Sequence, residues 1–332
     1  MMNQSRHGNI AFFIPHLGCR HQCSFCDQKS ISGKTAMPNS DELRTIIKQA
    51  LENHPHRTFQ VAFFGGSFTA VDNKTQRELL GAASDFIGRG ITGIRISTRP
   101  DAIDTGHLKM LKSFGVEAVE LGAQSMDDEV LLKNSRGHTA ADTQKAVSLI
   151  RKEGFEMGLQ MMPGLYGADK EKDILSASEM INCKPDTIRI YPTLVIQGTR
   201  LAEWWREGKY SPLTLEEGVR LTAQIMELFL KSNIRIIRVG LHSETSLKEN
   251  LLAGPYHPAF RQLCDGMIMQ NRLTVKLKEW PKGQLEVAVH PKNYSDMMGH
   301  KKSNLEYFLK RDYDITVTTD SKLLPYQLKI SC

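Results

Sequence analysis

The chain has 332 residues, of which 40% are hydrophobic and 24% charged, and its formal net charge is +6. These values are ordinary for a soluble globular protein with one large domain and a small one. The mild positive charge is compatible with a polyanionic partner without requiring one. Because no segment reaches the roughly 18 apolar residues of a membrane helix, and the apolar run from Ile10 to Ile14 is too short for a signal peptide, we expect a cytoplasmic protein.

The first two thirds of the chain alternate between short β-rich runs and helical stretches, which predicts parallel βαβ units. Six such repeats make either an open doubly wound sheet or a partial barrel. The expected strands are Ala11–Ile14, Phe59–Phe64, Ile94–Ser97, Ala118–Leu121, Glu156–Met161 and Thr187–Tyr191. The expected helices are Ser40–Asn53, Lys74–Gly88, Thr105–Phe114, Thr139–Glu153 and Lys170–Asn182.

A further helix over Leu215–Lys231 and a strand-like run over Arg235–Val239 follow these repeats. The sequence Gly254-Pro255-Tyr256-His257-Pro258 then reads as a breaker. From about Gly266 the composition changes to strand, turn and basic helix. We therefore predict a first domain over residues 1–265 and a small α+β domain over residues 266–332.

Polar and glycine-containing segments follow the end of every predicted strand. In parallel α/β folds these loops share one face, at the carboxyl ends of the strands, where active sites form. Turn chemistry alone can explain any single loop, but the set as a whole favours one shared site. After the first strand come cysteines, and then follow Gly65-Gly66-Ser67, Ser97-Thr98-Arg99-Pro100, Gly122-Ala123-Gln124-Ser125, Met162-Pro163-Gly164 and Tyr191-Pro192-Thr193.

Three of the six cysteines, Cys19, Cys23 and Cys26, are spaced CxxxCxxC. Thiolates hold iron–sulfur clusters, and three of them leave one iron of a four-iron cubane open to bind a substrate. Zinc is the alternative, with His16 or His21 completing the ligand set, although structural zinc usually takes two separated ligand pairs.

CxxxCxxC with an aromatic residue, Phe25, before the third cysteine resembles the signature of the radical-SAM superfamily, and the similarity runs from Ile10 to about Gly266. The resemblance implies a partial TIM-like (β/α)6 barrel and a [4Fe-4S] cluster that binds S-adenosylmethionine (SAM). It also implies reductive cleavage of SAM to a 5′-deoxyadenosyl radical, with an electron donor such as flavodoxin or ferredoxin.

The same resemblance implies which other residues bind SAM. Phe64-Gly65-Gly66-Ser67 looks like the family's glycine-rich motif, although many members carry Glu where this chain has Ser67. For each of these residues a helix cap or a surface charge is the alternative. The implied SAM-binding residues are Gly65, Gly66, Ser67, Ser97, Arg99, Glu120, Gln124 and Arg136.

Within the superfamily the chain looks most like the catalytic subunit of Elongator and its bacterial relatives. The resemblance is carried by Arg189–Thr199, Trp204–Tyr210, Met162–Leu165 and Pro15–Cys19. That group modifies a wobble uridine of tRNA with acetyl-CoA, through an acetyltransferase domain that follows the radical-SAM part. The sixty-six residues after Gly266 are too few for such a domain, so we do not transfer the acetyl-CoA chemistry.

The last segment reads as β–α–turn–α–β and resembles a KH RNA-binding module. In that module a GxxG loop between two helices clamps the nucleic-acid backbone. Here the loop is Gly299-His300-Lys301-Lys302, so its last glycine is replaced by Lys302. The expected RNA contacts are Lys292, Gly299, His300, Lys301 and Lys302; the alternative is a domain that only packs on the barrel.

The sequence therefore predicts a radical-SAM enzyme that modifies RNA, either tRNA or ribosomal RNA. Two alternatives remain: radical chemistry on a small molecule or peptide, and a non-enzymatic, metal-stabilised RNA-binding protein. The sequence names neither the substrate nor a hydrogen-donor residue.

Overall fold

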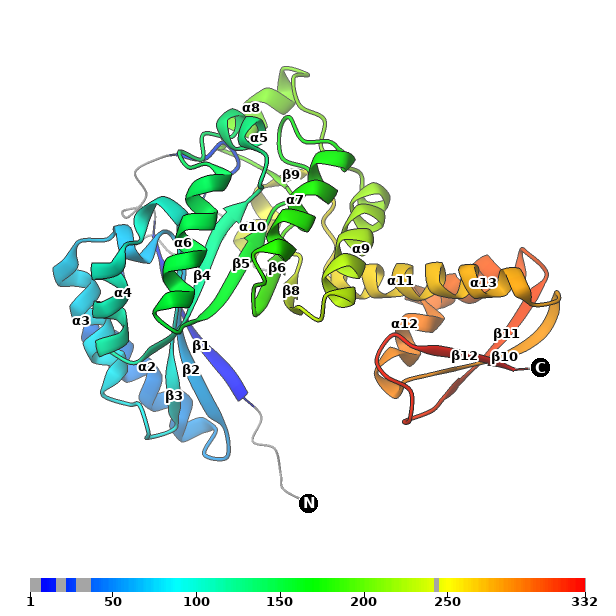
Figure 1. The fold of residues 1–332 in the computed structure, drawn as a ribbon, viewed down its shortest axis with the longest axis horizontal. Coiled ribbons are helices and arrows are strands. Elements are labelled where there is room, and N and C mark those ends of the chain that lie inside the picture. The colour runs from blue at the N-terminus through cyan, green and yellow to red at the C-terminus, as the bar shows by residue number, and fades with distance from the viewer. Residues whose placement is uncertain (1–6, 16–21, 28–36, 242–244, 332) are drawn as a thin grey trace.

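The computed structural model describes residues 7–15, 22–27, 37–241 and 245–331. Its main feature is a seven-stranded parallel sheet in the order β1-β2-β3-β4-β5-β6-β8, curved into part of a barrel with helices on its outer face (Figure 1). The strands are β1 (His7–Ile14), β2 (Thr58–Gly65), β3 (Ile91–Thr98), β4 (Val116–Gln124), β5 (Glu156–Met161), β6 (Thr187–Ile190) and β8 (Arg235–Val239).

The outer helices follow the strands in chain order. They are α2 (Ser40–Asn53), α3 (Asn73–Ser84), α4 (Thr105–Ser113), α6 (Ala140–Lys152), α7 (Lys170–Asn182) and α9 (Leu215–Lys231), whereas the short α5 (Asp128–Lys133) packs through Val130 beside Cys23 and Phe25. Their starts are fixed by side-chain caps; Thr139 and Thr214, for example, both form capping boxes. The apolar face of these helices covers the sheet and forms one continuous core.

The predicted fold class, a partial (β/α) barrel with a small α+β domain, is confirmed. The six predicted parallel strands are present, and the strand-like run Arg235–Val239 joins the same sheet beside β6. The sequence patterns missed the short elements near the cavity, because they have too few residues to show a period. These are α8 (Arg200–Arg206), α10 (Thr245–Asn250), and the strand pair β7 (Val195–Ile196) and β9 (Leu251–Ala253).

A long helix, α11 (Phe260–Lys276), joins the barrel to the C-terminal module (Figure 1). Its first half buries Phe260, Cys264 and Ile268 in the barrel core, and its second half buries Met269 and Leu273 in a second core. The predicted domain boundary after residue 265 stays a prediction; it falls inside this shared helix.

The C-terminal module is a three-stranded sheet in the order β11-β10-β12, packed against two short helices. Its elements are β10 (Gly283–Val289), α12 (Tyr294–Met298), α13 (Ser303–Leu309), β11 (Tyr313–Thr319) and β12 (Leu328–Ser331). The predicted β–α–turn–α–β order is thus present, with β10 and β11 parallel. No helix in the part of the chain that the structure describes is long and apolar enough to cross a membrane.

Candidate functional site

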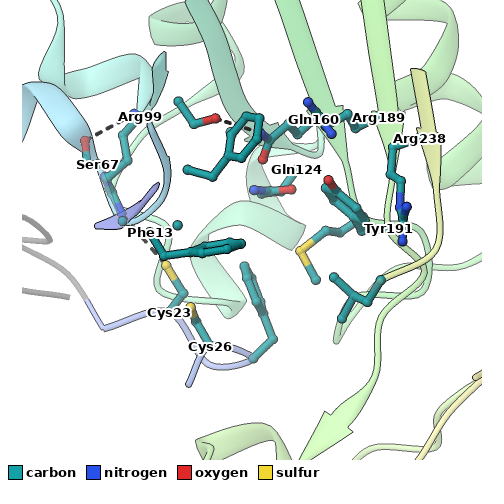
Figure 2. A pocket seen from close by; sticks show the side chains of 18 of the residues that line it. Phe13, Cys23, Cys26, Ser67, Arg99, Gln124, Gln160, Arg189, Tyr191 and Arg238 are labelled. Atoms are coloured by element: carbon teal, nitrogen blue, oxygen red, sulfur yellow. Dashed lines mark hydrogen bonds between the residues drawn. The ribbon is translucent and has the colours of Figure 1, made fainter. Parts of the chain in front are cut away.

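A cavity of about 490 Å³ lies inside the barrel, where the carboxyl ends of the strands meet the cysteine loop. Figure 2 shows Cys23 and Cys26 on one side, Gln124 in the middle, and Arg189, Tyr191 and Arg238 on the other side. The cavity therefore brings together residues from the first loop and from the last strands of the barrel, as the chain order of the polar loops predicts.

Two arginines lie beside Cys23 on the cysteine side of the cavity. Arg136 places Nη1 2.9 Å from the Cys23 Sγ, and Arg99 Nη1 lies 3.8 Å from the same sulfur. Arg136 also packs over the Phe25 ring, 5.9 Å from its centroid. Two buried guanidinium groups thus lie beside the Cys23 sulfur, and their positive charge complements the thiolate form in which cysteine binds an iron–sulfur cluster. The first cysteine of the motif, Cys19, and the two histidines offered as zinc ligands, His16 and His21, lie outside the described residues.

The glycine-rich loop after β2 has a steric reason for its glycines. Gly66 donates its N–H to the Ile14 carbonyl at 2.7 Å, and a Cβ on Gly66 would lie 2.6 Å from the Pro15 oxygen. Any side chain would therefore push the ends of β1 and β2 apart. This close approach fixes the position of the next residue, Ser67, whose Oγ lies 2.8 Å from the Thr98 hydroxyl.

Gln124 ends β4 with a strained backbone, φ +69°, and its side chain is buried in the cavity wall. Its Oε1 atom has no hydrogen-bond partner among the described residues, and neither has Nε of the neighbouring Arg136. Unpaired buried polar atoms cost about 1–3 kcal/mol each. A ligand that offers both donors and acceptors at this point would satisfy them.

The floor of the cavity is an ion network around Glu120. This carboxylate is fully buried and accepts hydrogen bonds from Arg95 at 3.0 Å and from Arg189 at 2.5 and 3.0 Å. Gln160 donates a weaker bond to it at 3.3 Å. Glu120 thus lies beneath the cavity wall with both oxygens occupied, and the structure gives it the role of holding Arg189.

The wall opposite the cysteines carries Tyr191 and two arginines. Burial, the largest cause, raises the pKa of Tyr191, so the phenol stays protonated at neutral pH. Arg189 packs over the Phe64 ring at 4.8 Å, and Arg238 donates its Nε–H to the Gly240 carbonyl at 2.9 Å. The sequence did not predict these arginines as site residues, because the side of the sheet that a strand residue faces is known only from the curved sheet itself.

The structure brings most of the predicted SAM-binding residues together. Every one of them except Glu120 lines the same cavity as Cys23 and Cys26: Gly65, Gly66, Ser67, Ser97, Arg99, Gln124 and Arg136. Cysteine and tyrosine are the residue types that can donate hydrogen to a radical; of these, Tyr191 lines the cavity, whereas Cys264 is buried in α11 and Cys183 caps α7. Contact of any of these residues with SAM stays a prediction.

The predicted RNA-binding residues lie on the C-terminal module. Lys292 is in the turn before α12, and Gly299, His300, Lys301 and Lys302 link α12 to α13. Gly299 has a structural reason of its own, since a Cβ there would lie 2.6 Å from the Ser303 Oγ. Their contact with RNA stays a prediction.

Two models of known protein families match the chain. The model of the radical SAM superfamily matches residues 13–176, and that of the radical SAM C-terminal domain matches residues 185–270. The chain belongs to the radical SAM superfamily. This assignment favours an iron–sulfur cluster over zinc at the CxxxCxxC motif.

Within the superfamily, the chain is similar in sequence to tRNA uridine(34) acetyltransferases and to Elongator complex protein 3. The chain is 28% identical over 288 residues to a tRNA uridine(34) acetyltransferase of Dehalococcoides mccartyi, covering 74% of this chain and 62% of that protein. It is 36% identical over 139 residues to human Elongator complex protein 3, covering 41% of this chain and 25% of the relative. The chain thus spans less than two thirds of the length of these relatives.

Solved structures agree on the fold. The archaeal Elp3 of Methanocaldococcus infernus superposes with a TM-score of 0.68 at 23% identity, over 81% of this chain and 64% of that one. Coproporphyrinogen III oxidase of Escherichia coli, described as a radical SAM enzyme, gives a TM-score of 0.51 at 16% identity, over 69% of this chain and 53% of that one.

Radical SAM enzymes use a [4Fe-4S] cluster and SAM, and the residues of this cavity fit both cofactors. Thiolates are the usual cluster ligands, and Cys23 and Cys26 face the cavity beside Arg136. The unpaired Oε1 of Gln124 is an acceptor and the unpaired Nε–H of Arg136 is a donor, which is the chemistry that matches the amino and carboxylate groups of SAM.

Proposed function

We propose that this radical SAM enzyme modifies RNA, and that tRNA is its substrate. The observation that carries the proposal is the cavity itself, in which the cysteine loop and the polar strand ends face a wall of two arginines. The kinship with tRNA uridine(34) acetyltransferases supports tRNA as the substrate. The acetyl transfer of those relatives is not part of the proposal.

When bound, the cluster supplies the electron that cleaves SAM and starts radical chemistry, with Cys19, Cys23 and Cys26 as its ligands. Arg136 and Arg99 hold positive charge against the Cys23 sulfur. The chain's other contribution is a cavity lined by apolar as well as polar residues, among them Phe13, Phe64 and Leu194, in which a reactive species is held away from bulk solvent in this proposal.

The far wall of the cavity orients the substrate. Glu120, Phe64 and Tyr191 fix the guanidinium of Arg189, so this group is preorganised to bind a substrate oxygen or phosphate. Arg238 adds a second positive charge on the same wall. This arrangement fits a nucleotide better than an apolar substrate.

The C-terminal module contributes RNA binding in this proposal. Lys301 and Lys302 are exposed, and both adopt left-handed backbone conformations in the turn between α12 and α13. Their ammonium groups are therefore presented to solvent at the end of α12, where a phosphate backbone can reach them.

The experiment that tests the proposal compares RNA modification in cells with and without this protein, by mass spectrometry of nucleosides from tRNA and ribosomal RNA. We expect loss of one modified nucleoside from tRNA and its return on complementation with wild type but not with Cys23→Ala. Unchanged nucleosides in both RNA classes, together with SAM cleavage by the purified enzyme, would instead favour a small-molecule or peptide substrate.

A further inference from the structure

A second cavity, of about 190 Å³, lies on the outer side of the wall that carries Arg238. Arg238, Ile237 and Leu241 line both cavities, so the end of β8 separates one from the other. The remaining lining of the second cavity comes from Val239 of β8 and from residues 257–262, which include the first turn of α11. The second cavity is therefore a neighbour of the active cavity, with Arg238 in the wall between them.

Cationic groups dominate this second cavity. Arg238 and Arg261 both line it, and each uses only part of its five N–H donors. Arg261 donates to the Ile236 carbonyl at 3.0 Å and lies 3.4 Å from the Asp265 carboxylate. Its side chain keeps 41% of its surface exposed. Both arginines thus retain donors that an anion can reach.

The arginines repel one another. Burial, the largest cause, and the charges of Arg189 and Arg261 lower the pKa of Arg238. Arg189 and Arg238 line the active cavity, and Arg238 and Arg261 line the second cavity, so Arg238 belongs to both groups. An anion bound between them relieves this repulsion, as phosphate does in arginine clusters.

The basic loop of the C-terminal module adjoins the second cavity. The His257 ring meets the His300 ring edge-on, with 5.4 Å between centroids. His257 Nδ1 accepts the Ala259 N–H at 3.0 Å, which leaves Nε2 as the ring nitrogen that can donate a hydrogen bond. The turn that carries Lys301 and Lys302 therefore continues the positive surface of the cavity.

Close packing holds this loop in place. A Cβ on Gly266 would lie 3.8 Å from the Gly299 Cα and 3.4 Å from the Asp296 oxygen, and Asn304 donates to the Gly266 carbonyl at 2.9 Å. Gly266 follows Arg261 by five residues on α11, a rise of about 7.5 Å. The loop and the second cavity are thus parts of one rigid surface.

We propose that the second cavity and the loop over residues 299–302 form one phosphate-binding track, which leads the backbone of an RNA strand from the C-terminal module to the active cavity. This inference rests on the proposed function, because it assumes that the substrate is RNA. It adds Arg238, His257 and Arg261 to the RNA contacts expected from the sequence.

The test measures binding of a uridine 12-mer and of bulk tRNA to the anaerobically reconstituted full-length protein, by fluorescence anisotropy at several salt concentrations. Each phosphate contact on a single strand contributes about 0.7 to the slope of log Kd against log salt. We expect Arg261→Gln and Lys301→Gln each to reduce this slope by about 0.7, to weaken binding roughly fivefold, and to act additively. Lys109→Gln, which removes one exposed positive charge on α4, is the matched control and should leave the slope unchanged.

Arg261→Lys keeps the positive charge and should therefore keep the salt slope. A slope as low as that of Arg261→Gln would overturn the proposal that the track binds phosphate through its positive charge. Competition by poly-glutamate as effective as that by the 12-mer would also overturn it, in favour of an acidic protein. If wild type binds RNA and both Gln variants keep its slope, this inference fails while the proposed function stands. If wild type shows no salt-dependent RNA binding at all, both fail.

Discussion

Replacing Glu120 by Gln tests the ion network beneath the active cavity. The Glu120 side chain is 1% exposed, and its partners Arg95 and Arg189 are 8% and 10% exposed. Gln keeps the shape of Glu but removes the charge and turns an NH₂ group toward a guanidinium. Removing one partner of a buried pair costs about 3–5 kcal/mol. Because Arg95 keeps Glu156 at 3.0 Å, we expect a loss near the lower figure, about 3 kcal/mol.

Anaerobic urea unfolding, followed by far-ultraviolet circular dichroism, measures this loss. Glu117→Gln is the matched control, because Glu117 lies on the same strand but is exposed; we expect a change below about 0.5 kcal/mol. The double variant Glu120→Gln/Arg189→Met removes one of the stranded charges and should recover part of the loss. A loss below about 1 kcal/mol for Glu120→Gln would refute the view that this network is held by its buried charge.

Two further predictions concern single polar contacts. Arg136→Gln removes the 2.9 Å contact with the Cys23 sulfur. Because a positively charged donor favours the reduced cluster, the midpoint potential of the cluster should fall by about 59 mV for each 1.4 kcal/mol of interaction lost. A redox titration followed by electron paramagnetic resonance measures this potential, and an unchanged potential would contradict the prediction. Burial raises the pKa of Asp173 to about 7, so its stabilising contribution is full below about pH 4, declines as the pH rises through 7 and is lost above it. The Asn side chain of Asp173→Asn still accepts the Gly164 N–H. The variant should therefore have a higher free energy of unfolding than wild type at pH 8, by at most about 4 kcal/mol, but not at pH 4. Chemical unfolding at the two pH values measures this difference, and an equal difference at both would count against the prediction.

The sequence predicted the barrel well because its strands and helices are long enough to show their periods. Glu156–Met161, Lys170–Asn182 and Leu215–Lys231 were placed to the residue. The loops followed from topology, since parallel strands bring their carboxyl ends to one face. Chain order alone therefore predicted that Gln124 would share a cavity with the cysteines, whereas Arg136 was expected there only from the resemblance to the radical-SAM superfamily.

The far wall of the cavity could not be predicted in the same way. Arg189 and Arg238 lie on apolar strands, and only the register of β6 with β8 shows that both face inward. Glu120 illustrates the opposite case: the resemblance to the family implied a cofactor contact, whereas in the partial barrel both Glu120 oxygens accept hydrogen bonds from arginines. Long-range pairing of charges leaves no local pattern in the sequence.

Anaerobic reconstitution with iron and sulfide tests the central claim most directly. We expect about four irons per chain and, with reductant and SAM, formation of 5′-deoxyadenosine detected by mass spectrometry. Cys19→Ala, Cys23→Ala and Cys26→Ala should each abolish both, whereas Cys183→Ala, outside the cavity, should retain them. A wild-type protein that binds zinc instead of a cluster, or that holds the cluster without cleaving SAM, would contradict the account.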